Sequence, residues 1–170
     1  MTRSTHGRWL LLWLLALAAP TQGKELSVGG AWTLVSYVRQ ESGGSSSKPW
    51  GEKPVGYLMY LPDGHMSAML TAEGRTPAGA NDAEGQARRA RLFANMTAYA
   101  GTYTVEGDRV VHHVEVSWIP DWVGTDQPRW ATIEGDRLFI RTGSMRSVMD
   151  GKEYVYVLEW KRAPAVNKAR

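Results

Sequence analysis

The clearest structural signal in the chain is the stretch VGYLMYLPDGHMSAMLT, residues 55–71. Its two ends are rich in residues that favour β-strands, and the turn-forming tripeptide Pro62-Asp63-Gly64 lies between them. Proline presets the φ angle of a turn, and glycine accepts a positive φ angle. The stretch therefore predicts a β-hairpin made of residues 55–61 and 65–71.

Two more hairpins are predicted further along the chain by the same reasoning. Glycine-centred turns at residues 106–108 and 134–136 separate β-prone runs at 102–105, 109–118, 129–133 and 137–142. Strands are also expected at 32–39 and 153–161, which makes eight in total. Because an open sheet of eight strands would leave two unpaired edges, we predict an all-β fold, an eight-stranded antiparallel up-and-down barrel. A barrel of this size holds packed side chains or one small ligand.

One segment between the third and fourth strands has a helical pattern instead. Asn81 can cap a helix, with Glu84 three residues later as in a capping box, and Glu84 and Arg88 form a favourable i,i+4 pair. The apolar residues that follow have helical spacing: Leu92, Phe93, Met96, Tyr99 and Ala100. We therefore expect one amphipathic helix over residues 82–99, with its arginines facing solvent.

The first 23 residues have the pattern of a secretory signal peptide. Arg3 and Arg8 precede an apolar run at residues 9–19, which ends near Pro20 and the small residue Gly23. The run is shorter than the roughly 20 residues that a membrane-spanning helix needs. The sequence thus predicts a periplasmic or secreted protein with no membrane span after cleavage, a retained anchor being the alternative. The absence of cysteine is more typical of a bacterial periplasm than of a eukaryotic extracellular protein.

Composition excludes several classes of function. Lysine and arginine total 20 and aspartate and glutamate 17, and without the two arginines of residues 1–23 the formal charge falls from +3 to +1. So small a charge gives no electrostatic case for nucleic acid as a partner. The lack of cysteine excludes a disulfide framework, a thiolate nucleophile and cysteine-ligated metals. The chain has no phosphate-binding loop, dinucleotide fingerprint or Gly-x-Ser-x-Gly motif, so no cofactor is expected.

Several stretches resemble the bacterial and fungal lipocalin-like domain family. Gly30-Ala31-Trp32 is similar to the Gly-x-Trp signature of lipocalins, whose tryptophan closes the barrel floor. Longer matches are PVGYLMYLPDGHMS (54–67), YAGTY (99–103), VHHVE (111–115), WVGTDQPR (122–129) and GDRL (135–138). The resemblance covers nearly all of residues 28–161 and implies a lipocalin-like barrel domain with an interior pocket over residues 24–170. It implies no single activity, although some related barrels act as isomerases or cyclases. Lys161 or Arg162 could cover Trp32 through a cation–π contact, as a basic residue commonly does in lipocalins.

The densest polar cluster is His112, His113 and Glu115 on the predicted strand 109–118. Side chains alternate along a strand, so His113 and Glu115 share one face and His112 lies on the other. We expect His113 and Glu115 to face the interior, because His65 and Arg129 could converge with them there. A histidine and a carboxylate two residues apart could exchange a proton. The alternatives are an exposed ion pair, and a hydrogen-bonded His112 on an apolar face.

Arg129 is a candidate anchor for a carboxylate at the barrel mouth, because its planar fork of donors fits that group. The alternative is a loop salt bridge to Asp121 or Asp126. The histidines are zinc-type ligands, but adjacent histidines on a strand point apart. No metal site is therefore expected.

These observations favour a binding protein over an enzyme. We expect an exported barrel that binds a small apolar or amphipathic molecule. Its polar lining would be Tyr60, His65, His113, Glu115 and Arg129, and its apolar walls Trp118 and Trp122. One alternative is a cofactor-free isomerase, cyclase or hydratase that uses His113 and Glu115 as acid and base. Another is a protein-interaction or inhibitor module that works through the loops at 41–54 and 119–128.

Overall fold

The computed structural model describes residues 26–41, 44–146 and 151–165, and the predicted signal peptide lies outside them. No helix in this part of the chain is long and apolar enough to cross a membrane. The elements are, in chain order, β1 (Gly30–Glu41), β2 (Ser46–Ser47), β3 (Val55–Tyr60), β4 (His65–Thr71), α1 (Ala83–Ala94), β5 (Met96–Glu106), β6 (Arg109–Ser117), the 3-10 turn η1 (Pro120–Trp122), β7 (Asp126–Glu134), β8 (Arg137–Thr142), β9 (Met145–Arg146) and β10 (Glu153–Arg162).

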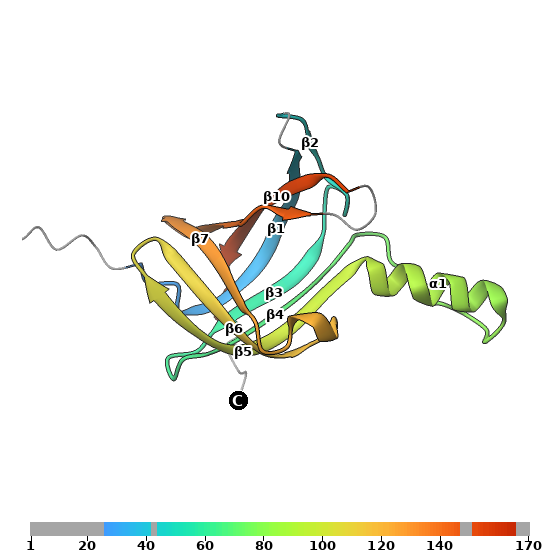
Figure 1. The fold of residues 1–170 in the computed structure, drawn as a ribbon, viewed down its shortest axis with the longest axis horizontal. Helices are drawn as coiled ribbons and strands as arrows, with labels where there is room; N and C mark the ends of the chain where they lie inside the picture. Colours follow the sequence, from blue (N-terminus) through green and yellow to red (C-terminus); the bar gives the residue numbers. More distant parts are fainter. Residues whose placement is uncertain (1–25, 42–43, 147–150, 166–170) are drawn as a thin grey trace, which may run out of the picture.

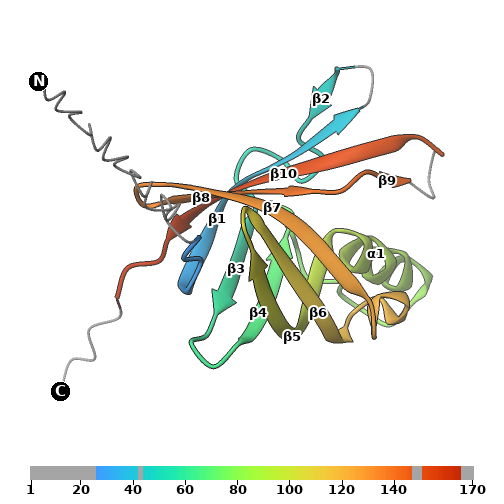
Figure 2. The same ribbon diagram turned by 60° about the vertical axis from the view of Figure 1, so that its left-hand side comes forward.

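The eight long strands close into an antiparallel barrel, as predicted (Figure 1). Neighbouring strands pair in sequence order from β3 to β8, and β10 follows β8. Strand β1 closes the ring because it pairs with both β3 and β10, so that Trp32 lies opposite Leu58 on one side and Arg162 on the other. The short strands β2 and β9 pair with the outer ends of β1 and β10, which extend past the other strands (Figure 2).

The predicted hairpin at residues 55–71 is confirmed. Strands β3 and β4 pair from Val55 opposite Thr71 to Tyr60 opposite Met66. The turn is closed by a hydrogen bond from the Leu61 amide to the His65 carbonyl at 2.8 Å, and Gly64 has a φ angle of 90°. Burial alternates strictly along β3, which places the odd-numbered side chains outside and the even-numbered ones in the barrel.

Trp32 occupies the barrel floor, as the resemblance to lipocalins implied. Its side chain is fully buried, and its indole Nε1 donates to the Val28 carbonyl at 2.8 Å. The Arg162 guanidinium carbon lies 4.1 Å from the Trp32 ring centroid, so Arg162 is the basic residue that covers it.

The helix is shorter than predicted and begins at a different cap. Asp82, not Asn81, is the N-cap, and its carboxylate accepts from the Gly85 amide at 2.8 Å. The helix ends at Ala94, whereas the prediction extended it to residue 99. The last four residues of the predicted helix instead begin strand β5, where Tyr99 is buried and lies opposite Ala68 of β4. Tertiary strand pairing therefore overrides the local helical spacing.

Helix α1 projects sideways from the barrel (Figures 1 and 2). Gly85 is its single buried residue. Arg88 Nε donates to the Ala78 carbonyl at 2.7 Å, and an Arg75 guanidinium nitrogen donates to the Leu92 carbonyl at 3.1 Å. These bonds hold the helix against the loop that precedes it.

A β-bulge interrupts the alternation of faces on β6. Gly101 of β5 lies opposite Val114, but the preceding Ala100 lies opposite Val116, which leaves Glu115 as the extra residue. Any side chain at Gly101 would collide with β6, because a Cβ atom there would lie 2.0 Å from the His113 carbonyl oxygen. Val116 is consequently exposed, although Val114 two residues earlier is buried. The bulge therefore places Val116 and His112 on opposite faces of β6, although simple alternation along the strand would put both on one face.

Candidate functional site

The barrel contains a cavity of about 150 Å³ that is partly open to solvent. Its walls are mainly apolar and aromatic, and they include Leu58, Leu70, Ile140, Leu158 and Trp160. Three of the polar residues that also line it lie on the neighbouring strands β5, β6 and β7: Tyr99, His112 and Arg129. The other polar residues of the lining are distributed over β1, β5, β8 and β10: Tyr37, Thr97, Thr142 and Tyr156. A mainly apolar chamber with a few polar groups is the usual form of a small-molecule site.

His112 is the centre of a buried hydrogen-bonded array. The hydroxyl of Tyr60 lies 2.7 Å from His112 Nε2, and the hydroxyl of Tyr99 lies 2.8 Å from Nδ1. Burial, together with the nearby charge of Arg129, lowers the pKa of His112 well below its ordinary value of 6.5, so the ring is uncharged at physiological pH. A neutral imidazole donates one hydrogen bond and accepts one. One tyrosine therefore accepts from the ring, and its own O–H remains able to donate elsewhere.

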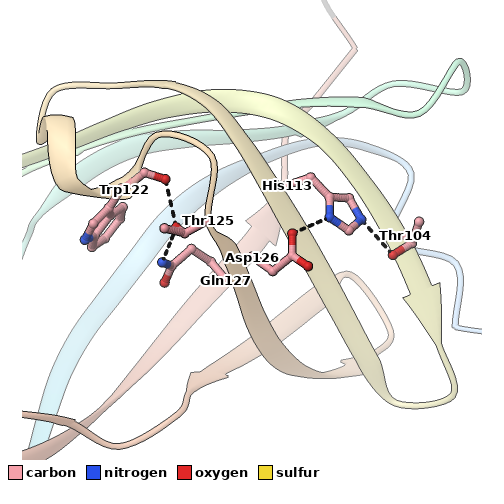
Figure 3. Close-up of polar contacts among 6 residues, drawn as sticks. All are labelled: Thr104, His113, Trp122, Thr125, Asp126 and Gln127. Carbon is pink, nitrogen blue, oxygen red and sulfur yellow. Dashed lines mark hydrogen bonds and ion pairs between the residues drawn. The ribbon is translucent and has the colours of Figure 1, made fainter.

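Arg129 lines the cavity from β7, with its side chain buried. One guanidinium nitrogen donates to the Pro128 carbonyl at 2.9 Å and the other to Gln127 Oε1 at 3.4 Å. The Gln127 amide in turn donates to the Thr125 hydroxyl at 2.9 Å, and that hydroxyl donates to the Trp122 carbonyl at 2.8 Å (Figure 3). One chain of hydrogen bonds thus fixes both Arg129 and the loop that carries Trp122.

The charge of Arg129 is surrounded by phenols that stay neutral. Burial raises the pKa of both Tyr60 and Tyr99, while the charge of Arg129 acts in the opposite direction on each. The polar side of the cavity is therefore one fixed cation beside uncharged hydrogen-bonding groups.

Three of the seven predicted site residues lie in the barrel interior. Trp122 and Arg129 line the cavity, and Tyr60 is buried behind His112. The position of Arg129 in the cavity supports the hypothesis that it anchors a carboxylate. Asp126, one of the two residues considered as its salt-bridge partner, is paired with His113 instead. Their part in ligand binding stays a prediction.

The expectation that His113 and Glu115 face the interior is wrong. His113 lies on the outer surface, where Nδ1 is 2.6 Å from an Asp126 carboxylate oxygen and Nε2 is 3.1 Å from the Thr104 hydroxyl (Figure 3). Glu115 is exposed at the bulge. These two residues therefore do not form an acid–base pair in the cavity.

His65 and Trp118 also lie outside the cavity, contrary to prediction. His65 is exposed at the start of β4, and its Nδ1 is 3.1 Å from an Asp63 carboxylate oxygen in the turn. Trp118 follows the bulge and packs edge-on against Phe93 of α1, with ring centroids 4.6 Å apart. The bulge places it on the outer side of the sheet.

Two site residues, Tyr99 and His112, were not predicted to line the pocket. The apolar neighbours Val110 and Val114 share the face of His112, and this signal pointed to an interior histidine. Tyr99 also fits the spacing of the predicted helix, so the sequence gives no signal that it lies on a strand facing the cavity. Among the described residues, no group of three or more histidine, aspartate or glutamate side chains could hold a metal ion.

Comparison with known proteins gives three findings. Residues 29–163 match the family described as lipocalin-like domain. The 4'-hydroxy-3'-methoxypropiophenone carrier protein of Aspergillus oryzae is 37% identical over 75 residues, which cover 39% of this chain and 67% of the relative. The crystal structure of a lipocalin-like protein from Bacteroides uniformis is similar with a TM-score of 0.41 and 13% identity, over 79% of this chain and 97% of that chain.

Proposed function

Because the chain belongs to the lipocalin-like domain family, we propose that it is an exported carrier of one small, largely apolar molecule. The observation that supports this function is the cavity of about 150 Å³ inside the closed barrel. Burial of apolar ligand surface against its walls would contribute about 25 cal/mol per Å² to the binding free energy. The polar groups of Tyr99, His112 and Arg129 would orient one end of the ligand.

The volume of the cavity indicates how large a group it can bury. About 150 Å³ is enough for a molecule the size of benzene, and it is below the range of drug-sized pockets. The fungal relative is named as the carrier of a propiophenone, which contains a single aromatic ring. A single-ring compound is therefore the size class that we propose for this protein.

Native mass spectrometry of protein purified from its own host tests the proposal directly. We expect a mass increment from a co-purified small molecule. Titration with single-ring aromatic compounds should also change the tryptophan fluorescence, because Trp122 and Trp160 line the cavity. Protein that carries no small molecule and shows no response to any such compound would contradict the function.

Filling part of the cavity with a larger side chain should weaken ligand binding. Ala68 of β4 is buried against the cavity, and Ala68→Leu should lower the affinity for a single-ring ligand about tenfold or more. The matched control is Ala100→Leu on β5, because Ala100 has only intermediate burial and does not line this cavity. Its affinity should stay within about threefold of the unmodified protein. Equal affinities of the two variants would show that the ligand binds elsewhere.

Export is supported by the pattern of residues 1–23, which lie outside the described part of the chain. Signal cleavage after Gly23 or Ala18 should give a mature protein that begins at Lys24 or Ala19. Intact-mass measurement on protein from the periplasmic or extracellular fraction of the host identifies the first residue of the mature chain. Recovery of the uncleaved chain from the cytosol would refute export and leave the binding function unaffected.

A further inference from the structure

The most informative feature of the cavity is a buried cation that forms no ion pair with any acidic residue in the described part of the chain. Arg129 is only 6% exposed, and none of the ion pairs found between the described residues includes it. Its hydrogen bonds go to neutral oxygens, those of Pro128, Gln127 and the Tyr99 hydroxyl. A guanidinium has more N–H donors than these bonds use. Burial of such a charge is unfavourable unless an anion pairs with it.

The titratable groups around Arg129 do not supply that anion. Its charge acts on Tyr37 of β1, Tyr60 of β3, Tyr99 of β5 and His112 of β6. Burial raises the pKa of each tyrosine, and burial and the charge of Arg129 together lower the pKa of the histidine. All four groups are therefore neutral at physiological pH. Of the two acidic residues of β7 itself, Asp126 is paired with His113 on the outer face, and Glu134 is exposed at the other end of the strand.

We propose that the ligand is a single-ring aromatic carboxylate, whose carboxylate binds the Arg129 guanidinium while its ring packs against the apolar walls. This inference rests on the proposed function. The planar guanidinium matches a carboxylate with two parallel hydrogen bonds, which a neutral carbonyl or amide cannot reproduce. The apolar side chains of Leu58, Leu70 and Ile140 provide the surface that contacts the ring.

Isothermal titration calorimetry with benzoate and benzamide separates charge from shape, because the two molecules are nearly the same size. The full-length protein should bind benzoate about tenfold or more tightly than benzamide. Arg129→Gln should weaken benzoate binding about tenfold or more and leave benzamide binding within about threefold. Arg129→Lys keeps the charge but loses the fork, so it should retain part of the preference for benzoate. Arg141→Gln, on the exposed face of β8, is the matched control and should change neither affinity.

The outcomes distinguish this inference from the function on which it rests. If both probes bind the unmodified protein equally, or if neither Arg129 variant weakens benzoate binding, the cavity takes ligands but Arg129 is not an anion site. If neither probe binds and no other single-ring compound does, the proposed function fails together with the inference. Should Arg129→Gln fail to fold, the Lys variant still decides, because loss of the fork alone must reduce the benzoate preference.

Discussion

Replacing Trp32 with alanine should lower the free energy of unfolding by about 3–5 kcal/mol. The indole is fully buried at the barrel floor, where β1 pairs with both β3 and β10. Its removal deletes a large apolar contact surface and leaves a cavity that the surrounding strands cannot fill. It also leaves the Val28 carbonyl without its indole donor. Urea denaturation followed by circular dichroism measures the loss.

Arg162→Ala is the matched control for this substitution, because it removes the cation above the ring and keeps the ring itself. We expect this variant to lose only about 0.5–1 kcal/mol, the usual contribution of an exposed cation–π contact. If Trp32→Ala cost no more than Arg162→Ala, the floor would not depend on the buried indole, and the role that we assign to Trp32 would be wrong.

Replacing His112 with alanine should cost about 3 kcal/mol or more. The imidazole is buried, and both its nitrogens are hydrogen-bonded to tyrosine hydroxyls. Truncation leaves a cavity and deprives the hydroxyls of Tyr60 and Tyr99 of their partner in an apolar interior. The adjacent His113 provides the control, since its contacts with Asp126 and Thr104 are on the surface. His113→Ala should cost about 1 kcal/mol or less.

The pH dependence of stability gives a second readout of His112. In the unfolded chain the ring takes up a proton near its ordinary pKa of 6.5, whereas in the folded protein burial and Arg129 lower that pKa. The unfolded state therefore binds more protons below pH 6.5, and stability falls as the pH drops, by at most about 1.4 kcal/mol per unit. Above pH 6.5 this contribution is constant. Chemical denaturation of the unmodified protein and of His112→Ala, from about pH 7.5 to about pH 5, should show a shallower slope for the variant. Identical slopes would mean that His112 is not buried in its neutral form.

The barrel could be predicted from the sequence because its strands are separated by turns with specific local chemistry. Pro62-Asp63-Gly64 and the two Glu-Gly-Asp turns define hairpins over a few residues, whatever the rest of the chain does. The residues of β5 were harder to assign, since Met96 to Tyr99 fit a helical pattern as well as a strand. Pairing of this segment with β4 is a long-range contact, and no local signal reports it.

The candidate site was predicted only in part, for a related reason. Arg129 and Trp122 were found because a lone arginine and a loop tryptophan stand out near a barrel mouth. The prediction that His113 and Glu115 face the interior assumes that polar groups from other strands converge with them. The apolar residues on either side of His112 indicate instead that His112 faces the interior, and the structure agrees with that pattern.

The amino-acid sequence by itself determined the eight strands, the tight turns and the tryptophan at the barrel floor, because each depends on neighbouring residues and on alternation along a strand. Only the tertiary structure decided which of two adjacent histidines enters the cavity and that β6 changes face after its bulge. Those features follow from how β5, β6 and β7 align with one another. A shift of one residue between paired strands exchanges the inner and outer faces, and that alignment depends on contacts between residues far apart in the chain.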